Sequence, residues 1–340
     1  MRSILITGAG GFLGLHTVDK LLARGAPHVR CLVRSKSLPD GLSQQYPNAC
    51  IEAQKGNILS AKDLEKALDG IDTVFHLAAE MKGAPSEIYM NTVVGSKRLL
   101  EAGRNARRFV LISSFGVYGV NQIAIGSVID EDTPLEQHPE RRDAYSFAKM
   151  RQELLFREYQ QKFGFELTVL RPGVIYGPGS TALSTRVGLK LPGLFLHVGG
   201  RNMLPLSYVE NTADAIAIAG SRSDVVSTLN VVDDDLITCR EYLRSYTRAV
   251  GNLRPLPVPY SIAMNMSRII AWYNGKSRGQ LPAVLTPYKA SALWRSQRFR
   301  NDRLKAIGWT QTVPTSVGLE KTFTSLAAAQ HCHANVPHPK

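Results

Sequence analysis

The stretch Ser3-Ile-Leu-Ile-Thr7-Gly8-Ala-Gly-Gly11-Phe-Leu-Gly14 decides the fold. A short apolar, β-branched run, typical of a buried strand, leads straight into a glycine-rich turn, and apolar residues at helical spacing follow. Strand, glycine turn and helix in this order predict a dinucleotide-binding turn. Gly8 and Gly11 would let the backbone approach a pyrophosphate, and Gly14 would let the helix pack against the strand. The free N–H groups at the helix start would then bind the phosphates.

Strands and helices alternate through the first half of the chain. We expect further strands at His28–Val33, 51–56, 72–79, 109–114 and 167–171, and helices at Ala61–Leu68 and 85–104. This alternation predicts an α/β fold, a Rossmann doubly wound parallel sheet with a smaller, mostly C-terminal substrate-binding region. Ligands bind such sheets at the carboxyl ends of the strands, where Gly8, Ala78, Ser114 and Arg171 fall.

The predicted organisation has three parts. Residues 1–171 form the dinucleotide-binding domain, to which a segment near 204–235 returns, and residues 172–203 and 236–325 form the substrate-binding region. Residues 326–340 are predicted to be a disordered tail. The tail contains His331, Cys332, His333 and His338, but it lacks a well-spaced fourth ligand, so we predict no metal site.

Composition and charge limit the classes of protein to consider. The chain has 340 residues, 44% of them hydrophobic, with neither a secretory leader pattern nor a spanning apolar run. Its four cysteines show no disulfide framework, which favours a cytoplasmic location. Of the net charge of +13, +10 lies between residues 241 and 310, where twelve Lys and Arg face two acids. Without a nucleic-acid motif, this excess suggests a basic surface, an acidic substrate or contact with an anionic membrane surface.

Tyr145-Ser-Phe-Ala-Lys149 places a phenol and an ammonium one helical turn apart. A lysine held there would favour the phenolate and lower the pKa of the tyrosine, which predicts a general acid/base for an alcohol oxygen. At the end of the second strand, Val33-Arg34-Ser35-Lys36 has a guanidinium where NAD sites usually have an acid. Arg34 therefore favours NADP(H), with NAD(H) as the alternative.

Six motifs in their expected order make the chain resemble an extended short-chain dehydrogenase/reductase of the epimerase/dehydratase and 3β-hydroxysteroid dehydrogenase group. They are Thr7-Gly8-x-x-Gly11-x-x-Gly14, His76-Leu-Ala-Ala79, Asn91-x-x-x-Gly95, Ser113-Ser114-x-x-Val117-Tyr118-Gly119, Tyr145-x-x-x-Lys149 and Arg171-Pro172-x-x-x-Tyr176-Gly177-Pro178-Gly179. Later matches at Tyr208-Val-Glu-Asn211 and Ala306-Ile-Gly-Trp309 extend the resemblance to nearly the whole chain.

The resemblance implies a role for each matching residue. Tyr145 would be the proton donor or acceptor, Lys149 would hold the nicotinamide ribose, and Ser114, rather than Ser113, would orient the substrate. Asn57 stands where the family usually has Asp, which alters the expected adenine contacts. The residues implied to bind the cofactor are Gly8, Gly11, Phe12, Leu13, Gly14, Arg34, Asn57, Ile58, Leu77, Ala78, Ala79, Tyr145, Lys149, Pro172 and Val174.

Departures from the family pattern discriminate between its reactions. Dehydratases carry an Asp-Glu pair where this chain has Phe115-Gly116, so dehydration is not expected. Nucleotide-sugar enzymes usually place a diphosphate-binding arginine where this chain has Leu204, although Arg201 lies nearby in the sequence. The substrate segment at 189–196 is strongly apolar.

A second apolar feature lies between Tyr260 and Tyr273. Ile262, Met266, Ile269, Ile270 and Tyr273 form one helical stripe, flanked by Arg268, Lys276 and Arg278. The stripe indicates domain core, or alternatively a hydrophobic lid or a membrane-surface helix.

We therefore expect an NAD(P)-dependent oxidoreductase that transfers hydride reversibly between nicotinamide and a hydroxyl or ketone carbon. The substrate would be apolar, similar to a hydroxysteroid or a 3-oxoacyl compound. The alternative is a nucleotide-sugar 4-epimerase with tightly bound NAD. The resemblance also implies a homodimer through the helices that carry Asn91 and Tyr145, and the basic C-terminal region suggests peripheral membrane contact.

Overall fold

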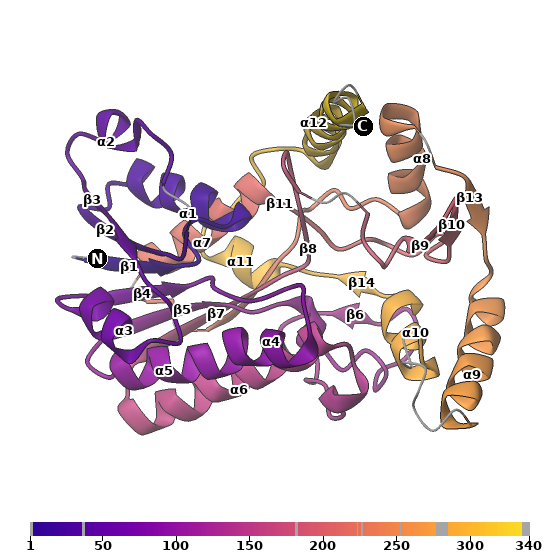
Figure 1. Ribbon diagram of the computed structural model, residues 1–340, viewed down its shortest axis with the longest axis horizontal. Helices are drawn as coiled ribbons and strands as arrows, with labels where there is room; N and C mark the ends of the chain where they lie inside the picture. Colours follow the sequence, from indigo (N-terminus) through magenta and orange to yellow (C-terminus); the bar gives the residue numbers. More distant parts are fainter. Residues whose placement is uncertain are drawn as a thin grey trace, which may run out of the picture.

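A seven-stranded parallel sheet runs through the larger part of the molecule (Figure 1). The computed structural model describes residues 3–35, 38–180, 183–222, 224–225, 227–251, 253–276 and 285–334, so Lys36, Arg278 and His338 lie outside the described residues. The strand order is β12-β7-β5-β4-β1-β2-β3, and every neighbouring pair is parallel. The strands are β1 (Ile4–Thr7), β2 (His28–Val33), β3 (Cys50–Lys55), β4 (Thr73–His76), β5 (Arg108–Ile112), β7 (Glu166–Pro172) and β12 (Thr228–Val231).

This order confirms the predicted doubly wound fold. From β1 the chain moves outward to β2 and β3, then crosses back to β4 and continues in the other direction. The strand order therefore reverses between β1 and β4, which is where such sheets bind ligands. The central strands are buried on both faces, as a parallel sheet covered by helices requires.

Helices cover both faces of the sheet (Figure 1). On one side, α1 (Phe12–Ala23), α7 (Val209–Ser221) and α11 (Asp302–Ala306) pack into one hydrophobic core, while α3 (Ala61–Leu68), α5 (Gly95–Ala102) and α6 (Ala144–Phe163) pack into a second. Helix α6 begins at a side-chain cap, because the Asp143 carboxylate accepts a hydrogen bond from the Ser146 N–H, and it ends at Gly164 in the left-handed region.

The helix predicted at 85–104 is interrupted. It consists of α4 (Pro85–Tyr89), a π-helical segment η1 (Met90–Val94) and α5. Such π segments insert an extra residue into a helical turn and are frequent at functional sites, a feature that apolar periodicity does not reveal. Asn91 lies in this segment and faces the cleft described below.

The remaining elements form the smaller region beyond the carboxyl ends of the sheet. Strand β8 (Val174–Tyr176) pairs with β11 (Leu206–Tyr208), and β10 (Leu194–His197) lies between β9 (Gly188–Leu191) and β13 (Pro255–Pro257). The other elements are α2 (Leu42–Gln45), η2 (Phe115–Val117), β6 (Val128–Ile129), η3 (Pro139–Arg141), α8 (Cys239–Val250), α9 (Tyr260–Lys276), α10 (Pro287–Trp294), β14 (Arg298–Phe299) and α12 (Thr315–Ala334).

Helix α12 corrects the prediction of a disordered tail. It continues to Ala334, so residues 326–334 are helical. The reason is packing against α8, where Phe323 lies against Tyr242 and Tyr246 and anchors the helix. Residues 335–340 lie outside the described residues. No helix in the described ranges is both long and apolar enough to cross a bilayer.

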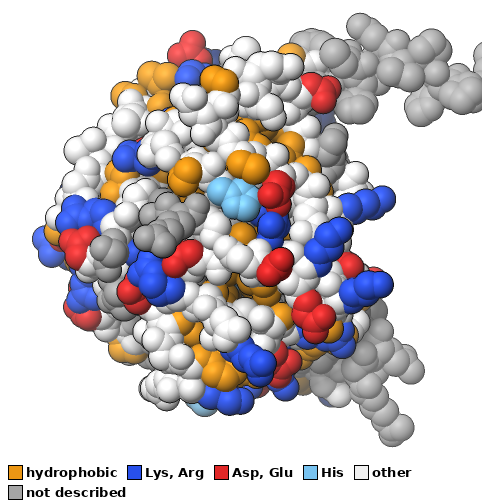
Figure 2. Space-filling view, turned by 90° about the vertical axis from the view of Figure 1, so that its left-hand side faces the viewer, with side chains coloured by type: hydrophobic (Ala, Val, Ile, Leu, Met, Phe, Trp, Pro, Cys, Tyr) orange, Lys and Arg blue, Asp and Glu red, His pale blue; other side chains and the backbone are white. Residues whose placement is uncertain are grey.

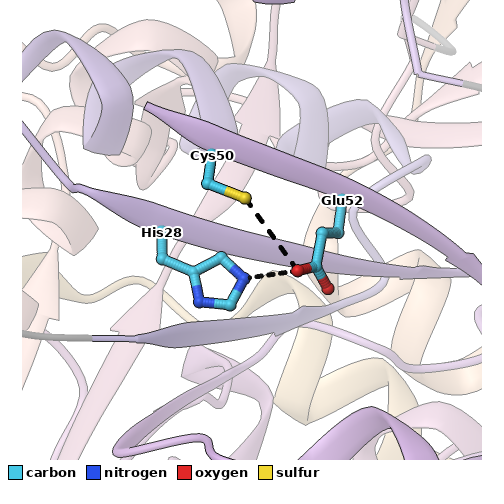
Figure 3. A group of neighbouring side chains, drawn as sticks. All are labelled: His28, Cys50 and Glu52. Carbon is cyan, nitrogen blue, oxygen red and sulfur yellow. Dashed lines mark hydrogen bonds and ion pairs between the residues drawn. The ribbon is translucent and has the colours of Figure 1, made fainter. Parts of the chain in front are cut away.

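One small polar cluster lies at the amino ends of β2 and β3, at the edge of the sheet opposite the cleft (Figure 3). Its ligand-type atoms, from His28, Cys50 and Glu52, lie within 4.8 Å of one another. The Glu52 carboxylate, however, is already bonded to His28 at 2.9 Å and to Arg30 at 2.6 Å. We interpret the cluster as an ion-pair link between two neighbouring strands.

Candidate active site

A cleft of about 1230 Å³ opens at the carboxyl ends of the central strands. Its lining runs from the glycine turn after β1, past the ends of β2, β4 and β5, to the start of α6 and to α10. Of the residues predicted to bind the cofactor or act in catalysis, every one lines this cleft except Asn57. The Asn57 amide oxygen instead accepts a hydrogen bond from the Leu59 N–H, which fixes the turn after β3.

The glycine turn fits a dinucleotide. Gly8 has a φ of +75°, and a Cβ at this position would lie 2.8 Å from the Ala78 nitrogen, so only glycine fits here. Helix α1 starts after Gly11 without a side-chain cap and without an acid in its first turn. Its unpaired N–H groups therefore favour an anion, as a pyrophosphate would require.

Tyr145 and Ser114 meet at the floor of the cleft. Tyr145 is in the first turn of α6, Ser114 follows β5, and their hydroxyls are hydrogen-bonded to each other. The neighbouring Ser113 is buried and donates to the Glu153 carboxylate at 2.6 Å, so its hydroxyl is directed away from the cleft. Of the two serines, Ser114 therefore has the geometry to orient a substrate oxygen beside the phenol.

Lys149 lies beneath this pair, but it does not lower the pKa of Tyr145. Its ammonium donates to the Ile112 carbonyl at 2.6 Å and to the Gln152 amide oxygen at 2.7 Å. Burial raises the pKa of Tyr145 to about 12, partly offset by the bond from Ser114. The expected direction of the shift is thus wrong, because the desolvation of the phenolate dominates and the ammonium bonds elsewhere. Burial also lowers the pKa of Lys149 to about 7, with Glu153 acting in the opposite direction.

A buried polar chain connects Lys149 to the glycine turn. Gln152 lies 3.1 Å from Nε2 of His76, and the other ring nitrogen of His76 lies 2.7 Å from the Thr7 hydroxyl. Burial, and then the charge of Lys149, lower the pKa of His76 to about 3, so this histidine is neutral at physiological pH. The chain ties the end of β1 to α6 by hydrogen bonds that need no net charge at the histidine.

One end of the cleft, beyond β2, is lined by the exposed Arg34. Arg34 follows β2, its side chain is 66% exposed, and it lies 3.4 Å from the Glu80 carboxylate. A long ion pair at an exposed position contributes little to stability, so the guanidinium can rotate to another anion at low cost.

The opposite end of the cleft has largely apolar walls, and the basic residues Arg142, Arg186 and Lys289 also line it. Its walls include Phe115, Leu189, Leu285 and Leu293. Arg186 also lines this end, and its guanidinium has no hydrogen-bond or ion-pair partner among the residues that the structure describes. Burial, and then the nearby Arg142, lower the pKa of Arg186 to about 10.

The neighbouring charges do not neutralise Arg186. Arg142 is paired with the buried Glu136 at 3.0 Å, and Asp143 is occupied in capping α6. An anionic ligand group would therefore find an unpaired guanidinium at this end of the cleft.

Two functional features could not be seen in the sequence motifs. Gln152 carries no family motif that we recognised, although its position one turn after Lys149 is compatible with a contact. Arg186 lies in a stretch without any motif. Conversely, Leu204 is fully buried in the core of the smaller region, and Arg201 is exposed and absent from the cleft lining, so neither lines the cleft.

Comparisons with known proteins agree with this geometry. The model of the NAD dependent epimerase/dehydratase family matches residues 4–231. The decarboxylating sterol-4-alpha-carboxylate 3-dehydrogenase of Candida albicans is 28% identical over 95% of this chain and 97% of its own length. The human enzyme of that description is 26% identical, over 94% of this chain and 87% of its own length.

Solved structures show the same fold. The UDP-glucose 4-epimerase of Thermus thermophilus, in complex with NAD, aligns with a TM-score of 0.70 at 21% identity, over 96% of this chain and 100% of that chain. Both kinds of relative, sterol dehydrogenases and nucleotide-sugar enzymes, are thus similar to this chain over nearly its whole length. The chain belongs to the NAD dependent epimerase/dehydratase family and is an enzyme of the extended short-chain dehydrogenase/reductase type.

Proposed function

We propose that this protein is an NAD(P)-dependent dehydrogenase or reductase that acts on a hydroxyl or ketone carbon of an apolar substrate. The observation that carries the proposal is the hydrogen-bonded Tyr145 and Ser114 pair, placed between the glycine turn and an apolar wall. A substrate oxygen bound between these hydroxyls would put its carbon within the cleft that the dinucleotide shares.

Each residue has a distinct role in this proposal. The nicotinamide group, when bound, supplies or accepts the hydride. Ser114 orients the substrate oxygen, and Tyr145 gives a proton to it during reduction or removes one during oxidation. Lys149 binds the nicotinamide ribose and, when its ammonium faces the phenol, stabilises the phenolate. The glycine turn and the start of α1 hold the pyrophosphate.

Arg34 supports a preference for NADP(H) over NAD(H). Its guanidinium lies at the end of β2, lines the cleft and is bound only to Glu80 among the described residues. A 2′-phosphate would replace that weak pair with a charge-assisted one. The family and its NAD-bound relatives indicate a nicotinamide dinucleotide in general, so the 2′-phosphate is the proposed refinement.

The substrate is proposed to be an apolar molecule with an acidic group. Leu189, Leu285 and Leu293 would contact the apolar body, and Arg186 would pair with the acid. The relatives named sterol-4-alpha-carboxylate 3-dehydrogenases support this class, because their substrate is both apolar and a carboxylate. An acid without an apolar body would not use the leucine wall, and a neutral sterol would leave the guanidinium unpaired.

The test follows the absorbance of reduced nicotinamide while purified protein is mixed with hydroxysteroids, sterol acids, 3-oxoacyl compounds and UDP-sugars. We expect cofactor-dependent absorbance change with an apolar hydroxy or oxo acid, lost in Tyr145→Phe. The alternative, a nucleotide-sugar 4-epimerase, is also compatible with the family. Purified protein that retains NAD(H), and that converts a UDP-sugar to its epimer without net absorbance change, would establish the epimerase and refute the dehydrogenase.

A homodimer through η1 and α6 is part of the proposal. Met90 on η1 and Leu154 on α6 are exposed, at 43% and 37%, on the helices that the family resemblance implicates. Leu154→Glu would place a charge in such an interface. Analytical ultracentrifugation should show a dimer that this variant dissociates, and a monomeric wild-type protein would rule the dimer out.

A further inference from the structure

Helix α9 packs against the protein through two buried small side chains and through the partly buried Tyr260 and Met264. Only Ala263 and Ser267 are buried among its seventeen residues, and they lie one turn apart on the same face. This face contacts α10, whose Lys289 and Leu293 line the cleft. The helix is therefore held at the rim of the substrate end of the molecule (Figure 1).

The opposite face of α9 presents large apolar side chains to solvent. Residues 262, 266, 269 and 273 recur at helical spacing, so they form one stripe, with Ile270 and Trp272 at its sides. The exposed fractions are 51% for Ile262, 41% for Met266, 64% for Ile269, 36% for Ile270, 60% for Trp272 and 55% for Tyr273.

This arrangement reverses the ordinary amphipathic helix. A helix of a globular protein turns its apolar stripe toward the core and its polar face toward water. Here the stripe expected to form domain core faces outward, while Ala263 and Ser267 face inward together with the partly buried Tyr260 and Met264. A contiguous exposed apolar surface of this kind marks a binding surface rather than an ordinary part of the exterior.

Basic side chains accompany the stripe. Arg268 lies on α9 and is exposed, and the Lys276 ammonium at its end lies 4.5 Å from the ring centroid of Trp272. The segment from residue 241 to residue 310 holds twelve basic residues against two acids, although Arg300, Arg303 and Lys305 are paired with acids. At the opposite end of the molecule, acidic and basic side chains are interspersed (Figure 2).

We propose that α9 docks on the surface of an anionic lipid bilayer. Its apolar stripe would enter the boundary between headgroups and acyl chains, Trp272 and Tyr273 would lie at headgroup level, and the basic residues would face anionic lipids. The charge selects a negative lipid surface over a neutral one, and no helix among the described residues could span it. Because α10 joins α9 to the cleft, docking would place the substrate end beside the membrane, where apolar molecules accumulate.

Tryptophan fluorescence offers a direct test. Trp294 and Trp309 are buried at 2% and 1% exposure, so a change in tryptophan emission on lipid binding would come mainly from Trp272. We would add vesicles of mixed phosphatidylcholine and phosphatidylglycerol to purified protein. A blue shift of the emission and co-sedimentation with these vesicles, but not with vesicles of phosphatidylcholine alone, are the expected results. Trp272→Phe should remove the blue shift and keep most of the co-sedimentation.

A pair of matched variants separates the stripe from general hydrophobicity. Ile269→Glu should weaken vesicle binding by at least about tenfold, since it inserts a charge into the buried face. Ile125→Glu is the control, because Ile125 is equally exposed, at 65%, but lies on a loop outside α9. The proposal would be overturned if wild-type protein did not bind anionic vesicles, or if both variants lost the same amount of vesicle binding. Self-association that Ile269→Glu abolishes without any lipid binding would assign the stripe to a second copy of the chain instead.

Discussion

The ammonium of Lys149 lies 2.7 Å from the amide oxygen of Gln152, one turn further along α6. Gln152 in turn bonds toward His76 and Ser96, so Lys149 is the end of a buried polar chain and not an isolated charge. The groups that accept hydrogen bonds from the ammonium are neutral, because they are the Gln152 amide and the Ile112 carbonyl. The protein therefore holds the ammonium in place at a cost in desolvation.

The desolvation of the Lys149 ammonium predicts how the free energy of unfolding depends on pH. The pKa of Lys149 falls from 10.5 to about 7 on folding, so between these values the unfolded chain binds more protons at this residue. The destabilisation is fully present below about pH 7 and is relieved as pH rises toward 10, with a slope of at most about 1.4 kcal/mol per pH unit. Urea unfolding at pH 7 and pH 9 should show this rise in wild type and lose much of it in Lys149→Met.

The exposed Lys62 on α3 provides the control for this measurement. Lys62→Met should keep the wild-type slope. A Lys149→Met variant with an unchanged slope would mean that Lys149 stays charged in the folded protein across this range.

Tyr145→Phe tests the acid/base role. The substitution removes the phenolic hydroxyl that bonds to Ser114 and leaves the ring in place. We expect kcat to fall by more than about a hundredfold, because proton transfer is lost, while the affinity for the dinucleotide changes little. Steady-state kinetics measure kcat, and a cofactor titration measures the affinity for the dinucleotide. Tyr159→Phe is the matched control on the same helix, since its hydroxyl bonds to Glu101 away from the cleft. Retention of a tenth of wild-type kcat would remove Tyr145 from this role.

Much of this machinery could be read from the sequence because it depends on local spacing. Gly8, Gly11 and Gly14 specify a turn within one strand–helix unit, and Tyr145 and Lys149 lie four residues apart on one helix. The contacts that set their chemistry are long-range and could not be read in this way. His76 and Gln152, for example, are brought together by the packing of α6 on the sheet.

Apolar periodicity also does not show whether the apolar face of a helix points to the core or to solvent. The stripe on α9 predicts a helix with one apolar face, and it does so correctly. Whether that face is buried depends on what else packs there, and a different face, with Ala263, Ser267, Tyr260 and Met264, makes the contact instead. Arg186 illustrates the same limit, because the lack of a partner among the described residues follows from the arrangement of the whole cleft.

Arg34→Asp tests the cofactor preference. Loss of the guanidinium removes the partner of a 2′-phosphate, and the new carboxylate can accept hydrogen bonds from the ribose hydroxyls of NAD(H). The ratio of kcat/KM for NADP(H) over NAD(H) should fall at least about tenfold. Arg248→Asp, on the exposed side of α8, makes the same charge change away from the cleft and should leave the ratio unaltered. Equal wild-type use of both dinucleotides would show that Arg34 does not select the cofactor.

Arg186→Met tests the acidic group of the substrate. The variant keeps a side chain of similar length and removes the charge, so the KM for an apolar hydroxy acid should rise more than about tenfold. The methyl ester of that acid should be used equally well by both proteins, because an ester offers no charge to Arg186. Arg186→Lys should recover part of the affinity, since it restores the charge without the planar guanidinium. If the Arg186→Met variant binds the acid as tightly as the wild-type protein does, Arg186 does not bind the acidic group of the substrate.

The last prediction separates the two substrate classes that the family allows. Leu204 replaces the usual diphosphate-binding arginine and is fully buried, and Arg201 is exposed and does not line the cleft. Arg186 faces a largely apolar wall that also holds Lys289, and Arg142 is paired with Glu136, so a diphosphate would lose hydration and gain one arginine partner. An apolar acid would satisfy that partner and also bury its hydrocarbon body, at roughly 25 cal/mol per Å². We therefore expect calorimetry on the cofactor-loaded protein to show weak binding of UDP and GDP and tighter binding of the apolar acid. Micromolar binding of UDP that Arg186→Met abolishes would instead assign the guanidinium to a diphosphate, and would favour the epimerase.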